Sequence, residues 1–324
     1  MFELNGNDMN LYKVKIIGVG TGGGQVVNAL IDLGLRSAYF IAVDTDAQAL
    51  ASSKAQSSIQ IGGEAGQGAG AGGSVEVGEQ AAAGSREEIT KALEGADLVF
   101  ILTALGGGTG TGAAPIIASC AKELGALTIG IAGLPFTSEG SSCSHRAAQG
   151  ACLLKQHADT LISISNDRLL SAVASEEKPS APDFTLIADF IYQVINSVLS
   201  LISVPGVINL DLDDMKSVMK NSGTCVVGIG TDHGAAEAAR KAVGFAFLGE
   251  NARKATKVLI NVTGAEDNIN MFEVNEATTI IQEAVSPSAD IIWGASADDK
   301  LGDTVNVVLI ATGFDSCEST PSQP

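Results

Sequence analysis

The sequence predicts an α/β fold in which a doubly wound parallel sheet is joined by one long helix to a smaller α/β unit. Three observations predict it. Short apolar runs rich in β-branched residues alternate with segments of helical spacing up to about residue 165. Two of these runs lead into glycine-rich segments, as strands do where they feed helices in parallel sheets. Residues 184–203 carry an apolar stripe too long for a strand and wide enough to be buried on several sides, which predicts a central helix.

Length and charge restrict the classes of protein to which this chain can belong. At 324 residues it has room for about two domains and a sizeable core. The 37 acidic and 19 basic residues give a formal net charge of −18, which argues against binding to nucleic acid or directly to an anionic membrane. No apolar run is expected to approach the length of a membrane span, and residues 1–12 lack the pattern of a secretion signal, so we expect a cytoplasmic protein.

Cysteine and histidine usage predicts no metal centre built from side chains. The five cysteines are odd in number and contain no CxxC pair, so we expect reduced thiols and no zinc site. The three histidines are scattered without ligand spacing and are expected to be surface or loop residues.

The first glycine-rich segment follows the first apolar run. Residues 13–17 are expected to form a strand that feeds a helix through a glycine-rich turn. Gly18, Gly20 and Gly23 in this turn fit the GxGxxG pattern, and Asp44 lies about twenty residues further, at the end of the next strand. This is the fingerprint of dinucleotide binding, so the segment predicts a phosphate site and leaves open an NAD-dependent oxidoreductase.

The second glycine-rich segment is the more informative one. Residues 106–112 contain five glycines and two threonines, between an expected strand at 96–103 and an expected helix at 116–124. Glycines expose successive backbone N–H groups, and the positive end of the following helix dipole favours an anion. No lysine follows, so this is not the Walker pattern, and amides, threonine hydroxyls and a metal ion have to balance a phosphate. A second such loop argues against a classical dinucleotide fold, and a merely flexible loop is the simpler alternative.

The remaining segments continue the alternation and supply the second unit. Residues 59–78 are rich in glycine, and composition of this kind is typical of a mobile linker. Residues 172–182 are a polar connector. The expected helices are 25–33, 79–93, 116–124, 144–156, 184–203, 235–246 and 274–284, and the expected strands are 13–17, 39–43, 96–103, 127–132, 159–164, 225–230, 257–263, 291–295 and 305–312.

A family resemblance is carried by the motif Gly106-Gly107-Gly108-Thr109-Gly110-Thr111-Gly112, which is similar to the signature loop of the tubulin/FtsZ superfamily. With Ala113-Ala114-Pro115 it resembles the FtsZ branch, the bacterial division GTPases. The resemblance implies GTP and GDP as ligands, with Mg²⁺ as the accompanying ion. It covers about residues 13–313 and implies a GTP-binding domain at 1–182, a central helix at 183–204, a C-terminal GTPase-activating domain at 205–313 and a short polar tail at 314–324.

The resemblance implies a nucleotide site built from several loops. Residues 71–73 would close on the γ-phosphate, which would make the glycine-rich segment a nucleotide-dependent switch instead of a linker. Glu139 would bond the ribose. Asn166 and Asp189 would recognise guanine, whose N1–H and 2-amino group a carboxylate accepts, and Phe184 would stack on the base. A helix cap is the simpler interpretation of Asn166. The implied nucleotide contacts are Gly20, Thr21, Gly22, Gly23, Gln25, Asp44, Ala71, Gly72, Gly73, Gly106, Gly107, Gly108, Thr109, Gly110, Thr111, Gly112, Pro135, Glu139, Cys143, Asn166, Phe184 and Asp189.

The chain departs from the family pattern in two places. Thr21 interrupts a run that is usually all glycine, which makes it a candidate to crowd a phosphate, and Gln25 and Asp44 each stand where asparagine is usual. Residues 141–143 are Ser-Ser-Cys where many members have two lysines and an arginine. This predicts slower hydrolysis unless another cation, for which Arg146 is the candidate, supplies the charge.

Acidic residues after the central helix give a second motif. Asn209, Asp211 and Asp214 match the loop that, in the FtsZ family, projects into the nucleotide site of the next subunit and completes it. On that resemblance they act in trans and orient water or a bound cation. The alternative is an ordinary acidic helix N-terminus, stabilised by the helix dipole.

Together with the motifs that carry it, the resemblance implies a self-assembling GTPase that forms head-to-tail filaments, hydrolyses GTP at the subunit interface and acts in cell division or septum positioning. Its expected partners are copies of itself and other division proteins, although the tail carries no recognisable membrane-anchoring peptide. Two other functions stay open: a GTP-binding filament protein with little or no hydrolysis, and the NAD-dependent oxidoreductase.

Overall fold

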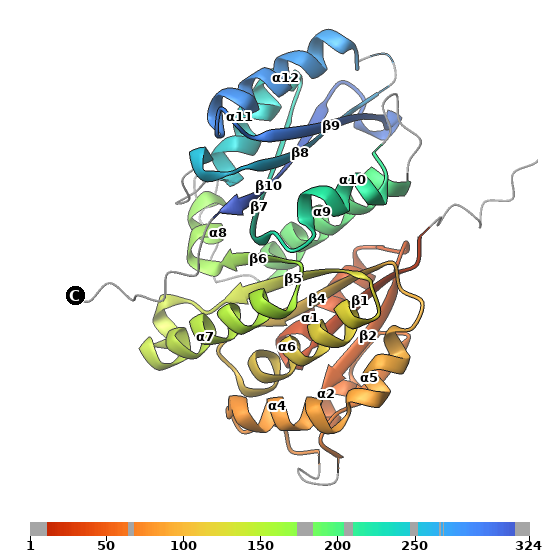
Figure 1. Cartoon of the computed structure of the whole chain (residues 1–324), viewed down its shortest axis with the longest axis vertical. Helices are drawn as coiled ribbons and strands as arrows, with labels where there is room; N and C mark the ends of the chain where they lie inside the picture. The colour runs from red at the N-terminus through yellow and green to blue at the C-terminus, as the bar shows by residue number, and fades with distance from the viewer. Residues whose placement is uncertain are drawn as a thin grey trace, which may run out of the picture.

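A single sheet runs through the part of the chain that the structure describes. The computed structural model describes residues 12–63, 68–173, 184–203, 210–246, 252–265, 267 and 269–314. Within them the sheet has ten strands in the order β3-β2-β1-β4-β5-β6-β7-β10-β8-β9. Figure 1 shows two halves stacked along the long axis, with the N-terminal elements below and the C-terminal elements above. The predicted α/β fold, with a long helix between a larger and a smaller unit, is confirmed.

The N-terminal half is a parallel, doubly wound sheet. Strands β3, β2, β1, β4, β5 and β6 all pair in parallel. Its elements are β1 (Val14–Val19), α1 (Gly20–Asp32), β2 (Tyr39–Asp44), α2 (Ala47–Ala51), β3 (Ser57–Gln60), α4 (Val75–Gly84), α5 (Arg86–Leu93), β4 (Leu98–Ala104), α6 (Gly108–Glu123), β5 (Leu127–Leu134), α7 (Ser141–His157), β6 (Thr160–Ser165) and α8 (Asn166–Val173).

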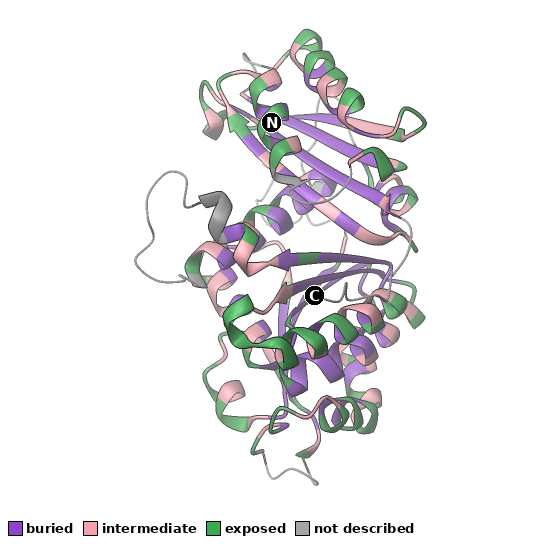
Figure 2. Cartoon of the chain, turned by 90° about the vertical axis from the view of Figure 1, so that its left-hand side faces the viewer, coloured by how far each residue is buried: buried purple, intermediate pink, exposed green. Residues whose placement is uncertain are grey.

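Helices cover both faces of this parallel sheet, because successive strand residues point to opposite sides. Ile16 and Phe100 belong to the core cluster shared with α1 and the central helix α9. Ile17 and Ile101, their neighbours in sequence, belong to the cluster shared with α4, α5, α6 and α7. Figure 2 shows the result, with buried strands inside and exposed residues on the outer sides of the helices.

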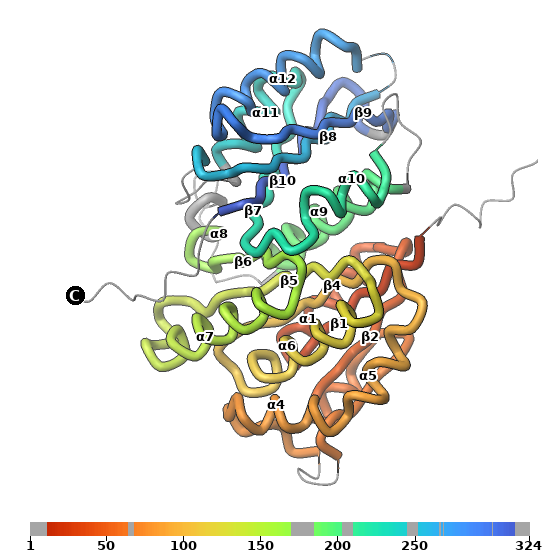
Figure 3. The backbone as a smooth tube through the Cα atoms, in the orientation of Figure 1, coloured from red at the N-terminus to blue at the C-terminus, as the bar shows by residue number. Residues whose placement is uncertain are grey.

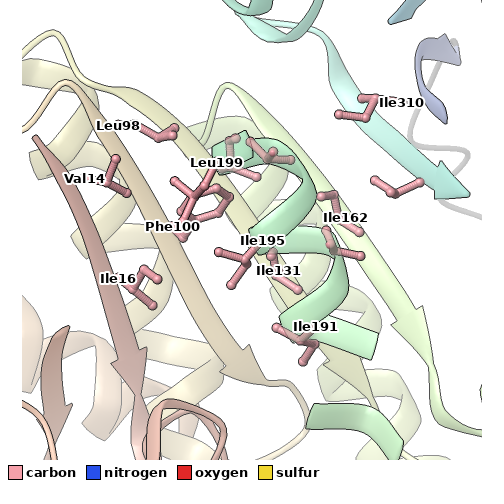
Figure 4. Close-up of a cluster of buried hydrophobic side chains, with 14 of the residues drawn as sticks. Val14, Ile16, Leu98, Phe100, Ile131, Ile162, Ile191, Ile195, Leu199 and Ile310 are labelled. Atoms are coloured by element: carbon pink, nitrogen blue, oxygen red, sulfur yellow. The ribbon is translucent and has the colours of Figure 1, made fainter. Parts of the chain in front are cut away.

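The central helix α9 (Phe184–Ser203) has the bounds that the sequence predicts. Its Ile191, Ile195 and Leu199 join a cluster with side chains of β1, β4, β5 and β6 (Figure 4). Ile310 of the C-terminal half belongs to the same cluster. One apolar core therefore extends across both halves.

The apolar character of α9 corrects one expectation. Residues Thr185–Ile202 have a mean hydropathy of 1.6 and are long and apolar enough, by length and composition alone, to cross a membrane, so the expectation that no run reaches this length is wrong. In the fold, Val194, Ile195 and Val198 are fully buried. Its hydropathy is accounted for by its place in the core, which is what the wide apolar stripe predicts.

The C-terminal half extends the same sheet. β7 (Gly223–Asp232) pairs in parallel with the start of β6 and antiparallel with β10 (Val305–Phe314). β10 pairs antiparallel with β8 (Lys257–Gly264), and β8 pairs in parallel with β9 (Asp290–Ala297). Helices α11 (Ala235–Ala246) and α12 (Met271–Ala284) cover one face. The other face packs toward α9 and α10 (Leu212–Met219), which lie between the two halves in Figure 3.

Several elements differ from the predictions. Both glycine-rich segments were expected as loops but form the first turns of helices, α1 from Gly20 and α6 from Gly108. The single helix expected at 79–93 is two helices, α4 and α5, which meet at Ser85 directly after Gly84, a weak helix former. The short elements β3 and α2 were not predicted, and α8 and α10 were predicted only as possible helix starts, because four to eight residues are too few for periodicity to detect.

Helix α4 lies on α6 because glycines leave no side chain between the two backbones. A Cβ added to Gly78 of α4 would lie 2.5 Å from the carbonyl oxygen of Gly108. A Cβ added to Gly112 of α6 would lie 2.1 Å from the carbonyl oxygen of Val75. Side chains at these two positions would therefore push the helices apart. The close backbone contact that the glycines allow fixes where α4 and the segment before it lie over α6.

Two substitutions in α4 test this packing. We expect Gly78→Ala to lower the free energy of unfolding by about 1–3 kcal/mol, because the methyl group meets backbone. We expect Gly84→Ala, in the same helix but with nothing within 4 Å of its Cβ position, to raise it by up to about 1 kcal/mol. Chemical denaturation of both variants measures the two values. A gain in the free energy of unfolding for both variants would show that helix propensity, and not contact with α6, decides.

Candidate functional site

Parallel strands of the N-terminal half end in one row, and the residues that follow them meet at that edge. Val19 of β1 pairs with Val43 of β2 and with Thr103 of β4, and Leu134 of β5 pairs with Ser165 of β6. The strand order reverses between β1 and β4. Ligands of open α/β sheets bind where the order reverses. The structure places the two glycine-rich segments at this point.

The two glycine-rich helix starts contact each other through their backbones. Gly20 has φ +71°, and a Cβ on it would lie 2.9 Å from the backbone nitrogen of Gly110. A Cβ on Gly23 would lie 2.3 Å from the carbonyl oxygen of Leu102 in β4. The first N–H groups of a helix have no partner within the helix, and here two helix starts adjoin. The edge therefore combines two positive dipole ends, which suits a polyphosphate.

Threonine hydroxyls form hydrogen bonds that hold the signature segment, residues 106–112, in place. The backbone N–H of Gly106 donates to Oγ1 of Thr111 at 2.9 Å, which closes the turn before α6. Oγ1 of Thr109 lies 2.7 Å from Oγ1 of Thr45, and both are buried. This bond ties the segment to the end of β2. Sequence reasoning did not select Thr45, and the one local signal for it is its place directly after a buried strand.

Cys143 and Arg146 of α7 flank Gly106. Gly106 has φ +109°, and a Cβ on it would lie 2.5 Å from Sγ of Cys143. Nε of Arg146 donates to the carbonyl oxygen of Gly106 at 2.9 Å, and its Nη1 donates to Oγ of Ser142 at 3.0 Å. The guanidinium that the sequence offered as a replacement cation is thus held beside the signature segment.

Thr21 and Asp44, two of the residues that depart from the family pattern, bond to each other. Oγ1 of Thr21 donates to Oδ2 of Asp44 at 3.1 Å, and the N–H of Asp46 donates to Oδ1 at 3.2 Å. Asp44 is 4% exposed. Burial raises the pKa of its carboxyl, while hydrogen bonds from Asp46, Thr21 and Thr45 oppose that rise. Thr21, Asp44 and the exposed Gln25 line a small pocket beside α1.

Residues 71–74 lie across the start of α6. A Cβ on Gly108 would lie 2.9 Å from Cβ of Ala71 and 2.7 Å from the carbonyl oxygen of Ser74. Gly72 and Gly73 have φ values of +58° and +82°, which make the turn that leads into α4. The predicted switch segment therefore contacts the signature segment, and its residues 64–67 lie outside the described residues.

Asn166 is the first residue of α8, directly after β6. Its Oδ1 atom is buried, and no described residue donates to it. A buried acceptor without a donor is unfavourable unless a ligand or water supplies one, so this atom fits a purine edge. Oδ2 of the neighbouring Asp167 accepts from the hydroxyl of Thr137 at 2.6 Å and from its N–H at 2.9 Å, and these bonds lower the pKa of Asp167. The Asp167–Thr137 pair, which joins α8 to the segment after β5, was not predicted.

The structure describes only part of the geometry of the other residues predicted to contact the ribose and the base. Pro135 and Glu139 follow β5 at the same edge, and Oε1 of Glu139 accepts the N–H of Phe136 at 2.8 Å. Asp189 is partly buried in the second turn of α9. Phe184 begins α9, and its side chain lies outside the described residues.

Asp211 and Asp214 begin α10 and cap it reciprocally. Oδ1 of Asp211 accepts the N–H groups of Asp213 at 2.8 Å and Asp214 at 2.9 Å. Oδ2 of Asp214 accepts the N–H of Asp211 at 3.1 Å. This capping box confirms the helix N-terminus that the sequence offered as an alternative role. Asp211 is exposed and Asp214 partly so, and Asn209 lies outside the described residues.

Helix α10 lies at the opposite edge of the sheet from the phosphate loops. The carbonyl oxygen of its last residue, Met219, accepts from Thr160, the first residue of β6, whereas Asn166 follows the last residue of β6. The length of that strand is about 20 Å. Figure 1 shows α8 on the left and α10 on the right of the molecule. The structure thus does not bring Asp211 and Asp214 together with the other predicted site residues.

Comparison with known proteins assigns the family. The geometry defines a nucleotide-binding α/β protein with two glycine-rich helix starts at one sheet edge. Residues 13–174 match the model of the tubulin/FtsZ family GTPase domain, and residues 223–315 match that of the FtsZ family C-terminal domain. The chain belongs to the tubulin/FtsZ family of GTPases.

Solved structures agree with this assignment. An FtsZ dimer from M. jannaschii is 35% identical, with 99% of this chain and 100% of that chain covered and a TM-score of 0.84. A mutant FtsZ from the same organism is 38% identical, with 93% and 91% covered and a TM-score of 0.84. CetZ2 from Haloferax volcanii is 21% identical, with 94% of each chain covered and a TM-score of 0.81, which shows the fold alone. The glycines that suggested a dinucleotide enzyme lie inside the GTPase match, so that interpretation loses its support.

The buried carboxyl of Asp44 predicts a pH-dependent stability. Because its folded pKa is raised, the protein pays to keep Asp44 charged above that pKa, and this destabilisation disappears as the pH falls and the carboxyl is protonated. We expect Asp44→Asn to be more stable than the unchanged protein at pH 7, and the difference to shrink toward pH 4. Urea unfolding of both proteins between pH 4 and 7.5 measures it. A stability difference between the two proteins that stays constant over this pH range would contradict a raised pKa of Asp44.

Proposed function

We propose that this chain hydrolyses GTP within head-to-tail filaments, where α10 of one copy completes the nucleotide pocket of the next. The observation that carries the proposal is the separation of the two sites. The phosphate loops follow the carboxyl ends of the strands, and the carbonyl end of α10 is bonded to the start of β6. Stacking copies along the direction from α8 to α10, across the long axis of the molecule, would bring the opposite edges together. The related FtsZ structure is described as a dimer and the CetZ2 structure as a GTPγS-bound protofilament, which supports self-association.

Different residues of the pocket would bind different parts of the nucleotide. Amides at the starts of α1 and α6 would hold the phosphates, and residues 71–73 would close over the terminal one. Oδ1 of Asn166 would accept from the base, and Asp189 would accept from N1–H and the 2-amino group, which selects guanine over adenine. Arg146 would supply positive charge next to Gly106, although its present bond is to the carbonyl oxygen there.

Carboxylates delivered by a neighbouring copy have a defined task. Each of Asp211 and Asp214 uses one oxygen for the cap of α10, and among the described residues the second oxygen of each has no hydrogen-bond partner. These oxygens would accept hydrogen bonds from the attacking water and orient it in line with the γ-phosphate. Asn209 would assist from the adjoining loop.

Magnesium fits this site as an ion carried by the nucleotide. Among the described residues no group of three His, Cys, Asp or Glu side chains gathers to hold a metal. Mg²⁺ commonly binds through phosphate oxygens and water with few protein ligands, and it would neutralise charge that no lysine of these loops neutralises.

A second candidate function is a filament protein that binds GTP and hydrolyses it slowly. It is favoured by Cys143, which packs on Gly106 in a place where the family usually has cations. Phosphate release measured against protein concentration separates the two. A threshold followed by a rise supports assembly-dependent hydrolysis, and no release at any concentration supports the slow filament protein. For either, we propose a role in cell division or septum positioning in the cytoplasm.

Asp214→Asn tests the acid in trans. Asparagine keeps an acceptor oxygen for the cap of α10 but removes the charge, so we expect folding and GTP affinity to be unchanged and turnover to fall about 100-fold or more. Asp213→Asn is the matched control, because Asp213 lies in the same turn, is largely exposed and pairs with Lys216 outside the capping box. GTP binding and phosphate release are measured on all three proteins. Lost GTP binding by Asp214→Asn with normal turnover per bound GTP would contradict the scheme.

Mixing two inactive variants distinguishes trans from cis action. Gly107 is exposed and a Cβ on it meets nothing within 4 Å, so Gly107→Glu should fold normally and repel phosphate. Alone, it should bind little GTP. In a mixture with Asp214→Asn, its intact Asp214 would meet an intact pocket of the other variant, and turnover should return. A mixture as inactive as its parts would sink the trans arrangement.

Asp189→Asn tests nucleotide choice. Loss of the charged acceptor should weaken GTP binding about 10- to 100-fold, because a hydrogen bond to a charged group contributes about 1.5–3 kcal/mol. The affinity for ATP should be equally weak in Asp189→Asn and in the unchanged protein. Titration with both nucleotides measures the change, and Gln193→Ala, an exposed change on the same helix, serves as control. Equal GTP affinities of Asp189→Asn and the unchanged protein would remove Asp189 from the site.

A further inference from the structure

The carbonyl end of α10 is occupied by side chains from three strands. The last four carbonyl groups of a helix have no partner within it. In α10 the oxygen of Ser217 accepts from Nζ of Lys257 at 2.6 Å, and the oxygen of Val218 accepts from Oγ1 of Thr312 at 3.0 Å. The oxygen of Met219 accepts from Oγ1 of Thr160 at 2.6 Å. A backbone N–H, that of Lys220, takes the fourth oxygen, that of Lys216.

These side chains come from both halves of the molecule. Thr160 begins β6 of the N-terminal half, whereas Lys257 begins β8 and Thr312 lies in β10 of the C-terminal half. Thr160 and Thr312 are fully buried. A buried hydroxyl aimed at a helix carbonyl defines position more closely than apolar packing does, because a hydrogen bond weakens steeply with distance and angle. The end of α10 is therefore fixed to both halves at once.

The turn after α10 is fixed in the same way. Asn221 has φ +52°, its N–H donates to Oδ1 of Asp159 at 3.3 Å, and its own Oδ1 accepts from Nζ of Lys122 at 2.6 Å. Asp159 is buried, and its carboxylate also accepts the N–H of Thr128 at 3.0 Å. Lys122 lies in the last turn of α6, the helix that begins at the signature segment. The contacts thus continue from the phosphate site, along α6, to α10.

We propose that Thr160, Thr312 and Lys257 act as positioning residues for GTP hydrolysis: by clamping the carbonyl end of α10 to both halves, they aim Asp211 and Asp214 at the pocket of the next copy. The inference rests on the proposed function and adds to it three residues that touch no nucleotide. Helix α10 has eight residues and spans about 12 Å, so it transmits a tilt at its clamped end directly to its acidic start. Misplacement of a reacting group by about 1 Å can lower a rate 100-fold.

The test compares threonine-to-valine changes that differ in whether the lost hydroxyl is bonded to α10. Thr160→Val and Thr312→Val remove a hydroxyl bonded to α10 and keep the side-chain shape. Thr128→Val is the matched control, because Thr128 is equally buried and its hydroxyl donates to the oxygen of Ala126, away from α10, while its backbone bond to Asp159 is retained. Lys257→Met removes the third clamp at a site exposed enough to tolerate the change. Thr160→Ser and Thr312→Ser restore the hydroxyls.

We measure GTP affinity of the monomer, sedimented polymer, and kcat per sedimented subunit at saturating GTP. For the two valine variants and Lys257→Met we expect kcat to fall about 10-fold or more with unchanged GTP affinity and polymer mass, for Thr128→Val no such fall, and for the serine variants recovery. Unchanged kcat in Thr312→Val and Lys257→Met, or an equal fall in Thr128→Val, overturns the proposal. If the unchanged protein shows no assembly-dependent hydrolysis, the proposed function itself fails, which is a separate outcome.

Discussion

The close approach of two glycine-rich helix starts is the constraint on which the rest of the structure depends. Gly20 of α1 and Gly110 of α6 meet where a Cβ would lie 2.9 Å from a backbone nitrogen. Any side chain at Gly20 would separate the helix starts, and with them the two positive dipole ends that suit a polyphosphate. The Thr45–Thr109 bond adds the end of β2 to the same unit. Three segments that are distant in sequence are thereby held together at the edge that suits an anion.

The helices that leave this site carry its position through the molecule. α6 begins at the signature segment and ends beside Asn221, which Lys122 holds. On the other face of the sheet, α9 packs in a cluster that includes Ile16 of the first strand and Ile310 of the last. The phosphate site and the acidic start of α10 are consequently opposite ends of one packed body. The core therefore fixes where the two ends lie relative to each other. Copies that assemble along one axis can use this fixed placement, with no flexible link between the two ends.

Much of the fold was predictable because its signals are local. The bounds of α9 and α11 were predicted to the residue, since long apolar stripes have a clear period, whereas β3 and α2 have too few residues for any period to show. The glycine patterns picked out the two segments that meet at the sheet edge, but they did not show that those glycines begin helices, because that depends on contact between distant segments. The orphaned Oδ1 of Asn166 and the bonds from Lys122 and Asp159 to the turn after α10 are tertiary facts without a sequence pattern.

Thr21 and Asp44 are understandable only as a pair. A threonine within a glycine run was expected to crowd a phosphate, but Thr21 is exposed and its hydroxyl donates to Asp44. A carboxylate accepts this bond on Oδ2 and the N–H of Asp46 on Oδ1, whereas an asparagine has one acceptor oxygen for two donors. The aspartate in turn titrates, and an amide does not. Burial raises the pKa of Asp44 and the bonds from Asp46 and Thr21 oppose that rise, so the pair keeps a titratable carboxyl beside the glycine-rich helix starts, where the usual asparagine would place a neutral amide.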